Sequence, residues 1–193
     1  MKKIGLAILV AAIVSGCAST SDINLKQERF TSNVKIAEYN DLANEYMDKA
    51  TFAKVMRMDT LKGDTVKYQA ESYNPLYVKG QGYLNEKLEI VIHVSDISPV
   101  MEAIAKYEKW EAMASLNGDM IEKDILEFDS GFNSTMSYKL GFYSGNPSTH
   151  YLTITKCGLL GRCGSAKVFL SKKSVEALKY DVEKLKSGEL AKL

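Results

Sequence analysis

The chain has 193 residues, of which 46% are hydrophobic, and its 25 lysines and arginines nearly balance 24 aspartates and glutamates. This length suits one ordinary domain, and the apolar content is sufficient for a packed core, which argues against global disorder. Because neither charge is in surplus, the composition gives no indication of nucleic-acid binding.

The N-terminus has the features of a signal peptide. Two lysines follow the first methionine, and an apolar run covers residues 4–14. That run has the length of a signal-peptide core and is too short to span a bilayer. The sequence therefore predicts export of the chain, without a permanent transmembrane helix in this segment.

A cysteine stands where such a signal would be cut. The residues at this point are Val14, Ser15, Gly16 and Cys17. A branched apolar residue, two small residues and a cysteine resemble the lipobox of bacterial lipoproteins. The resemblance implies that residues 1–16 are removed, that Cys17 is lipidated, and, from Ala18, that the outer membrane is the destination. Two or more acyl chains give stable anchoring; an ordinary secretory signal with an incidental cysteine is the alternative.

The mature chain is expected to begin with a tether. Residues 17–33 are polar and without periodicity, which predicts a lipidated tether, and residues 34–193 are predicted to form a single domain. A helix is expected at the start of this domain, because five side chains align at helical spacing. They are Tyr39, Ala43, Tyr46, Met47 and Ala50.

From residue 52 onward, apolar and polar side chains alternate, which is typical of half-buried strands. The segments with this pattern are 52–61, 64–72, 87–95, 136–143, 150–157 and 165–170. The first two are expected to pair as a hairpin.

Two amphipathic helices interrupt the strands. One is expected to begin at Ser98 and end at Gly118, and the other to begin at Ser174 and end at Gly188. The order of elements predicts an α+β fold: an antiparallel sheet of several strands, two or three amphipathic helices and one disulfide-closed hairpin. The two helical segments resemble each other, but lysine-rich amphipathic composition accounts for this, so a duplication is not expected.

Two cysteines, Cys157 and Cys163, remain after lipidation. In an oxidising compartment a close pair predicts a structural disulfide, whereas a redox pair is more often spaced C-x-x-C and a zinc site needs further ligands nearby. We therefore expect a disulfide between the last two strands and neither a metal nor another cofactor.

The loop between these cysteines contains Leu159, Leu160 and Arg162. Adjacent leucines are unusual at a turn that only reverses the chain. One hypothesis folds a leucine back into the core; the other has the stiffened tip contact a partner or the membrane interface.

Catalytic signals are weak. His93, Ser95 and Asp96 lie close enough in sequence to form a nucleophile, base and orienting group, but no nucleophile elbow or histidine-rich metal motif is present. His150 is expected at the rim of the sheet. The sequence predicts a non-enzymatic binding or assembly module in the periplasm, anchored to the membrane by the lipid on Cys17, with an envelope protein as its partner. The alternatives are an inhibitor or phage-type exclusion lipoprotein and a small envelope hydrolase that uses His93.

Overall fold

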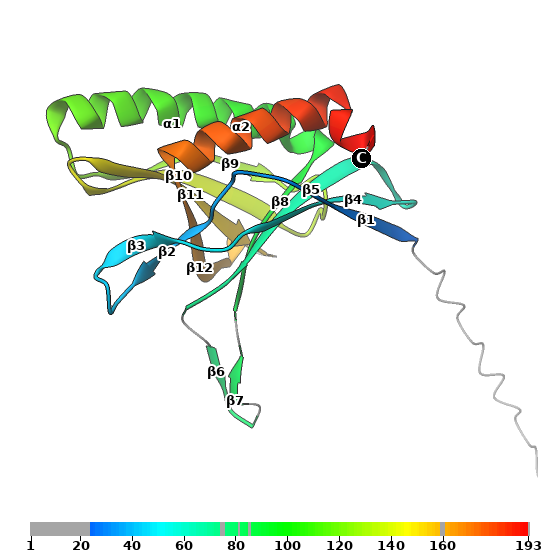
Figure 1. Cartoon of the computed structure of the whole chain (residues 1–193), viewed down its shortest axis with the longest axis horizontal. Helices are drawn as coiled ribbons and strands as arrows, with labels where there is room; N and C mark the ends of the chain where they lie inside the picture. Colours follow the sequence, from blue (N-terminus) through cyan, green and yellow to red (C-terminus); the bar gives the residue numbers. More distant parts are fainter. Residues whose placement is uncertain (1–23, 74–75, 81, 85, 159–160, 193) are drawn as a thin grey trace, which may run out of the picture.

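The computed structural model describes residues 24–73, 76–80, 82–84, 86–158 and 161–192. The described chain is mostly β, with antiparallel sheets covered on one side by two α-helices (Figure 1). The predicted signal peptide and Cys17 lie outside the described residues.

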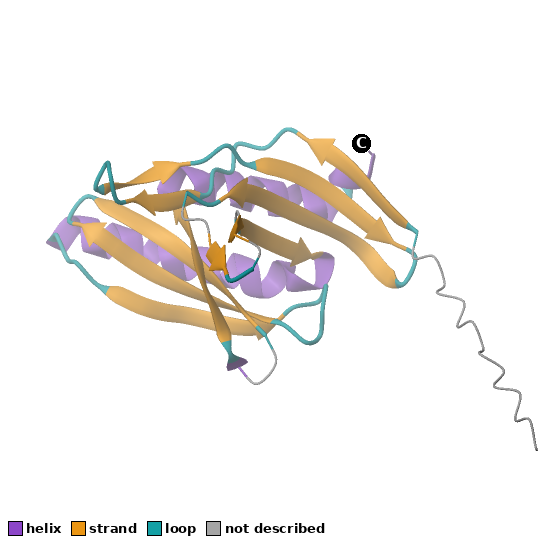
Figure 2. Ribbon diagram, turned by 90° about the horizontal axis from the view of Figure 1, so that it is seen from below, coloured by secondary structure: helices purple, strands orange, loops and turns teal. Residues whose placement is uncertain are grey.

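Both sheets lie on the same side of the helices, and the first is a four-stranded antiparallel sheet (Figures 1 and 2). Its strands, in spatial order, are β1 (Leu25–Phe30), β4 (Phe52–Met58), β5 (Leu61–Glu71) and β8 (Lys87–His93). The predicted hairpin is confirmed, since β4 pairs with β5 and Val55 lies opposite Val66. The tether prediction is wrong for Leu25–Phe30, which pairs with β4. Five of its six side chains are exposed, so no apolar alternation marks the strand in the sequence.

The second sheet is antiparallel and has six strands. Its strands, in spatial order, are β3 (Glu45–Asp48), β2 (Ala37–Asn40), β12 (Cys163–Ser171), β11 (Thr149–Cys157), β10 (Ser137–Asn146) and β9 (Glu122–Asp129). Three predicted strands are confirmed here as β10, β11 and β12. The edge strand β9 was not predicted, because none of its side chains is fully buried.

The helix expected near residues 39–50 is absent, and β2 and β3 form a hairpin there. The Asn40 side chain accepts hydrogen bonds from the backbone N–H groups of Leu42 and Ala43, and Asn44 has φ 55°, so the chain reverses in a tight turn. Tyr39 and Tyr46 are register partners across the hairpin. Seven residues separate them, a spacing that also fits two turns of a helix, and this coincidence explains the wrong prediction.

Both later helices are confirmed as α1 (Ile97–Asn117) and α2 (Lys172–Ser187), and both end at left-handed glycines, Gly118 and Gly188. A 3₁₀ turn, η1 (Val94–Asp96), precedes α1, and a second, η3 (Glu189–Lys192), follows α2. The helices lie on the same side of the sheets (Figure 1). In the described part of the chain, neither helix is both long and apolar enough to cross a membrane.

The two halves of the chain repeat one topology. The meander β1-β4-β5-β8 leads into α1, and the meander β9-β10-β11-β12 leads into α2. Hairpin β2–β3 is inserted in the first meander, as is a second hairpin formed by β6 (Leu76–Val78) and β7 (Gly82–Leu84). Hairpin β6–β7 projects away from the helices (Figures 1 and 2). The two halves therefore share one order of strands and helix, although a duplication was not expected from the sequence.

One cluster of buried apolar side chains lies between the helices and both sheets. A polar contact crosses this core, where the Tyr68 hydroxyl donates to Asp181 Oδ2 at 3.0 Å and the Ser32 hydroxyl donates to the same oxygen at 2.5 Å. Burial raises the pKa of the Asp181 carboxyl, and the two hydroxyl donors oppose that shift. The contact joins β5 to α2 and so ties the two halves together.

Candidate functional site

The face of the six-stranded sheet opposite the helices carries a group of tyrosines. Alternation along β10 places Phe142 in the core and Tyr143 on this outer face, and along β11 it does the same for Leu152 and Tyr151. The β2–β3 hairpin adds Tyr46, whose ring lies 4.5 Å from that of Phe169 between centroids. The hairpin therefore folds its aromatic side chains over the outer face of the sheet.

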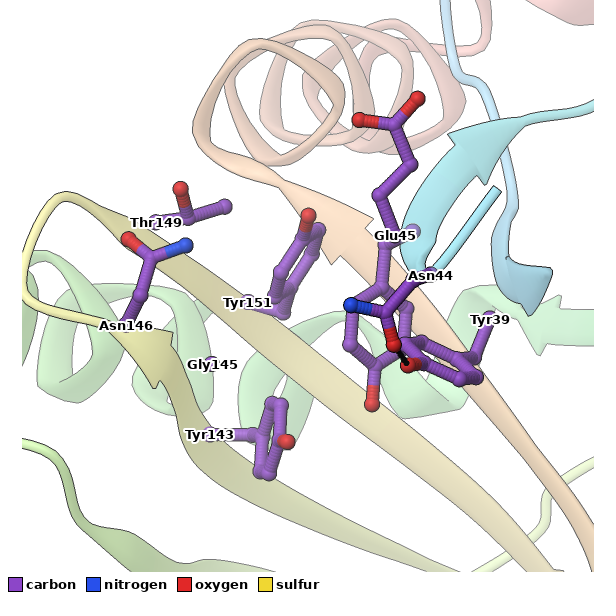
Figure 3. Close-up of a pocket in the computed structure, with 9 residues that line it drawn as sticks. Tyr39, Asn44, Glu45, Tyr143, Gly145, Asn146, Thr149 and Tyr151 are labelled. Carbon is purple, nitrogen blue, oxygen red and sulfur yellow. Dashed lines mark hydrogen bonds between the residues drawn. The ribbon is translucent and has the colours of Figure 1, made fainter. Parts of the chain in front are cut away.

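These tyrosines line a pocket of about 640 Å³, here called the tyrosine pocket (Figure 3). Its lining residues are Tyr39, Asn44, Glu45, Tyr46, Tyr143, Gly145, Asn146, Thr149 and Tyr151. Figure 3 shows Asn146 at the end of β10 and Thr149 at the start of β11 on one side of Tyr151, and Asn44 and Glu45 on the other. The volume falls within the range of about 300–1,000 Å³ typical of small-ligand sites.

Tyr46 is the centre of the aromatic group. Its ring centroid lies 5.3 Å from that of Tyr39, 5.7 Å from that of Tyr143 and 4.8 Å from that of Tyr151. The Tyr39 hydroxyl donates to Asn44 Oδ1 at 2.5 Å. Because aromatic packing and this hydrogen bond hold the rings, the pocket walls are ordered before any ligand arrives.

The electrostatics of the tyrosine pocket are negative. Among the described lining residues Glu45 is the only acidic one, and none of them is a lysine or arginine. Burial raises the pKa of Tyr151, and the nearby carboxylates of Asp48 and Glu45 raise it further. The pKa of Tyr46 is raised first by burial and then by the neighbouring Tyr143 side chain. The phenols of Tyr46 and Tyr151 therefore remain neutral hydrogen-bonding groups, and the site is suited to binding by ring faces and polar contacts.

His93, Ser95 and Asp96 come together, but not as a catalytic triad. His93 Nε2 lies 3.1 Å from the Lys62 carbonyl oxygen, which can only accept, so Nε2 carries the proton and Nδ1 accepts from the Ser95 hydroxyl at 2.8 Å. The Asp96 carboxylate accepts from the backbone N–H groups of His93 and Gly131, at 3.0 and 2.8 Å. It therefore caps η1 and does not orient the imidazole.

Access to this cluster is also restricted. His93 is 5% exposed, and a methyl group built on Gly131 would lie 1.8 Å from Ser95 Oγ. The backbone of Gly131 thus packs directly against the serine hydroxyl, where a substrate carbonyl would have to approach. This geometry favours a structural role for all three residues at the start of α1.

His150 does not lie at the rim of the sheet, as was expected, but in the interior. Its side chain is 5% exposed, stacks on Phe142 with 5.6 Å between ring centroids, and Nδ1 lies 3.0 Å from the Ser144 hydroxyl. The alternation of β11 directs it toward the helices, because its neighbour Tyr151 faces outward. It is therefore no part of the outer face.

The predicted disulfide between Cys157 and Cys163 is present and closes the β11–β12 hairpin. The backbone N–H of Gly158 donates to the Arg162 carbonyl at 2.8 Å across the loop, and Arg162 is exposed. Leu159 and Leu160 lie outside the described residues, so both hypotheses for them remain predictions.

The sequence analysis did not identify the tyrosine pocket. Its hairpin residues were assigned to a helix, and Tyr143 and Tyr151 were noted only as parts of strands. The sequence nevertheless contains a signal for the pocket. Tyr143 and Tyr151 each stand next to an inward apolar residue of a predicted strand, so both face outward, and the chain has 11 tyrosines in all. Within the described ranges no group of three or more histidine, cysteine or acidic side chains could hold a metal ion.

Comparison with known proteins gives no further assignment. No protein-family model, no curated protein and no solved structure matches the chain.

Proposed function

We propose that this protein is a non-enzymatic binding module of the bacterial envelope, held at the outer membrane by a lipid on Cys17 and facing the periplasm. The observation that carries the binding role is the ordered tyrosine pocket, which offers four phenol rings and several hydrogen-bonding groups in one hollow. The hydrolase alternative has less support, because His93 is buried and Asp96 does not reach its ring.

The position of the pocket suits an anchored binding module. β1 begins at Leu25, so only seven residues (18–24) separate it from Cys17. Even when the chain is fully extended, the eight steps from Cys17 to Leu25 reach roughly 26 Å at about 3.3 Å per residue. β1 begins at one end of the molecule, whereas hairpin β2–β3 and the β10–β11 turn lie at the other end (Figure 1). The tyrosine pocket would therefore be presented away from the point of attachment.

The binding role can be tested by site-specific crosslinking in intact cells. A photoreactive amino acid is placed at Asn146, an exposed residue of the pocket lining, and in a control variant at Lys109, an exposed residue of α1. We expect a discrete adduct from position 146 and none from position 109. Equal labelling from both positions, or none from either, would contradict a binding site in the tyrosine pocket.

The lipid anchor is tested by fractionation of cells that express the variant Cys17→Ser. Without the thiol no lipid can be attached, so the protein should leave the membrane fraction and the precursor should remain uncut. Membrane partitioning that is unchanged in this variant would refute the lipid anchor while leaving the binding role intact.

A further inference from the structure

We propose that the tyrosine pocket receives the basic side chain, lysine or arginine, of an extended polypeptide segment of a partner protein. The inference rests on the proposed binding role and specifies its ligand. It is carried by the charge of the pocket, by the arrangement of the rings and by the sheet edge next to them.

The charge of the pocket favours a cation. The faces of aromatic rings carry negative potential, and a cation placed over them is attracted by about 0.5–2 kcal/mol. Glu45 adds a full negative charge to the lining, and Asp48 lies on the same strand. Neither carboxylate forms an ion pair with any described residue. A basic group is thus the ligand that would neutralise these charges, and an anionic ligand would be repelled.

The size of the site favours a ligand larger than an ammonium ion. A second hollow, of about 240 Å³, lies on the same face of the sheet as the tyrosine pocket, which has about 640 Å³. Gly141 and Thr153, which line the second hollow, lie two residues from Tyr143 and Tyr151 along their strands. Residues two apart in a strand face the same side of the sheet, so both hollows open on the outer face. Gly141 has no side chain to fill the second hollow, and a Cβ at this position would lie 2.8 Å from Thr153 Oγ1. An extended segment of several residues matches this shape.

The neighbouring sheet edge favours a polypeptide. β3, which contributes Glu45 and Tyr46 to the pocket, is the last strand of the six-stranded sheet. Its outer edge has no strand partner among the described residues, so its backbone N–H and C=O groups can pair with an added strand. Pairing at this edge would bring alternate side chains of the added strand toward the pocket.

The test measures binding of short peptides to the full-length protein purified in detergent, by calorimetry at low ionic strength. The probe is the acetylated and amidated peptide Gly-Thr-Lys-Thr-Gly, and its matched control replaces lysine by norleucine. We expect the norleucine peptide to bind about tenfold more weakly, the effect of losing roughly 1.4 kcal/mol of cation attraction. Choline and the neutral sugar chitotriose serve as further probes.

Variants assign the binding to the pocket. Glu45→Gln should weaken the lysine peptide about tenfold, while Glu183→Gln, which removes an exposed charge on α2, should leave it unchanged. Tyr143→Phe keeps the ring and should bind within about twofold of wild type, whereas Tyr143→Leu should lose about tenfold. Glu45 is exposed, so its substitution tests the proposal even if a tyrosine variant fails to fold.

The outcomes separate this inference from the binding role itself. Equal affinity for the lysine and norleucine peptides, or insensitivity to Glu45→Gln, would overturn it. So would binding of choline or chitotriose without binding of the lysine peptide, although the pocket would then remain a binding site. An absence of adducts from position 146 in cells would instead contradict the binding role.

Discussion

At the scale of single residues, the least expected polar group is Asp181. Its carboxyl is buried between α2 and β5, and it accepts hydrogen bonds from Tyr68 and Ser32. Burial of a charge is costly, and here it raises the pKa of the carboxyl above the ordinary 3.8. An apolar stripe reveals the buried face of a helix, but it does not reveal an acid within that face, so the sequence analysis did not identify this residue.

The raised pKa of Asp181 has a consequence for stability. In the unfolded chain the carboxyl loses its proton near pH 3.8, whereas in the folded chain it does so at higher pH. Between these two values the folded state binds more protons, so its contribution to the free energy of unfolding is present at lower pH and is lost as the pH rises. Asp181→Asn cannot ionise, and its side-chain oxygen can still accept from both hydroxyls.

We therefore expect Asp181→Asn to gain stability relative to wild type as the pH rises from 4 to 7, as measured by urea unfolding at each pH. Asp59→Asn, at an exposed turn, is the matched control. A difference between wild type and Asp181→Asn that does not change with pH would show that the carboxyl ionises alike in both states.

At the scale of elements, the sequence predicted the helices and strands that have one apolar face, and it did not predict the strands that lack one. Both long helices and four of the strands that pack on the core, β5, β8, β10 and β11, follow the expected period, because burial imposes it. β1 and β9 are edge strands with few buried side chains, and backbone pairing defines them instead. Backbone pairing leaves no periodic signal in the side chains of such strands. The hairpin of the tyrosine pocket was mistaken for a helix for a different reason, namely that the spacing of Tyr39 and Tyr46 also fits two helical turns.

The disulfide stabilises one of these elements. Replacing both Cys157 and Cys163 by alanine should lower the free energy of unfolding by about 2 kcal/mol, since the bridge closes a short loop in the unfolded chain. The fold should persist, because β11 and β12 also pair from Tyr151 opposite Ser171 to Thr155 opposite Lys167. Urea unfolding of the variant, compared with oxidised wild type, provides the measurement, and reduced wild type, which also lacks the bridge, is the control. Two free thiols in the oxidised wild-type protein would contradict the prediction.

At the scale of the whole molecule, the two topologically similar halves interlock. Helix α1 belongs to the first half, yet its Tyr107 hydroxyl donates to the His150 carbonyl on β11, at 3.2 Å, and its Trp110 lies 6.5 Å from Phe142 on β10 between ring centroids. In the opposite direction, Arg57 on β4 donates to the Leu190 carbonyl at 3.2 Å. Each half therefore completes its core with groups from the other.

This interlocking predicts one cooperative unfolding transition. Trp110 is the single tryptophan and reports on the contact between α1 and the second meander, whereas far-ultraviolet circular dichroism reports on all strands and helices. If both halves share one core, the two signals should give the same urea midpoint and the same slope, as expected of a two-state domain. The variant Trp110→Phe, followed by circular dichroism alone, controls for any effect of the indole on stability.

A fragment ending at residue 120 should lack a folded spectrum, because α1 would lose the sheet on which it packs. Separate midpoints for the two signals, or a folded fragment, would show that each half is stable by itself and that the repeated topology reflects two independent units.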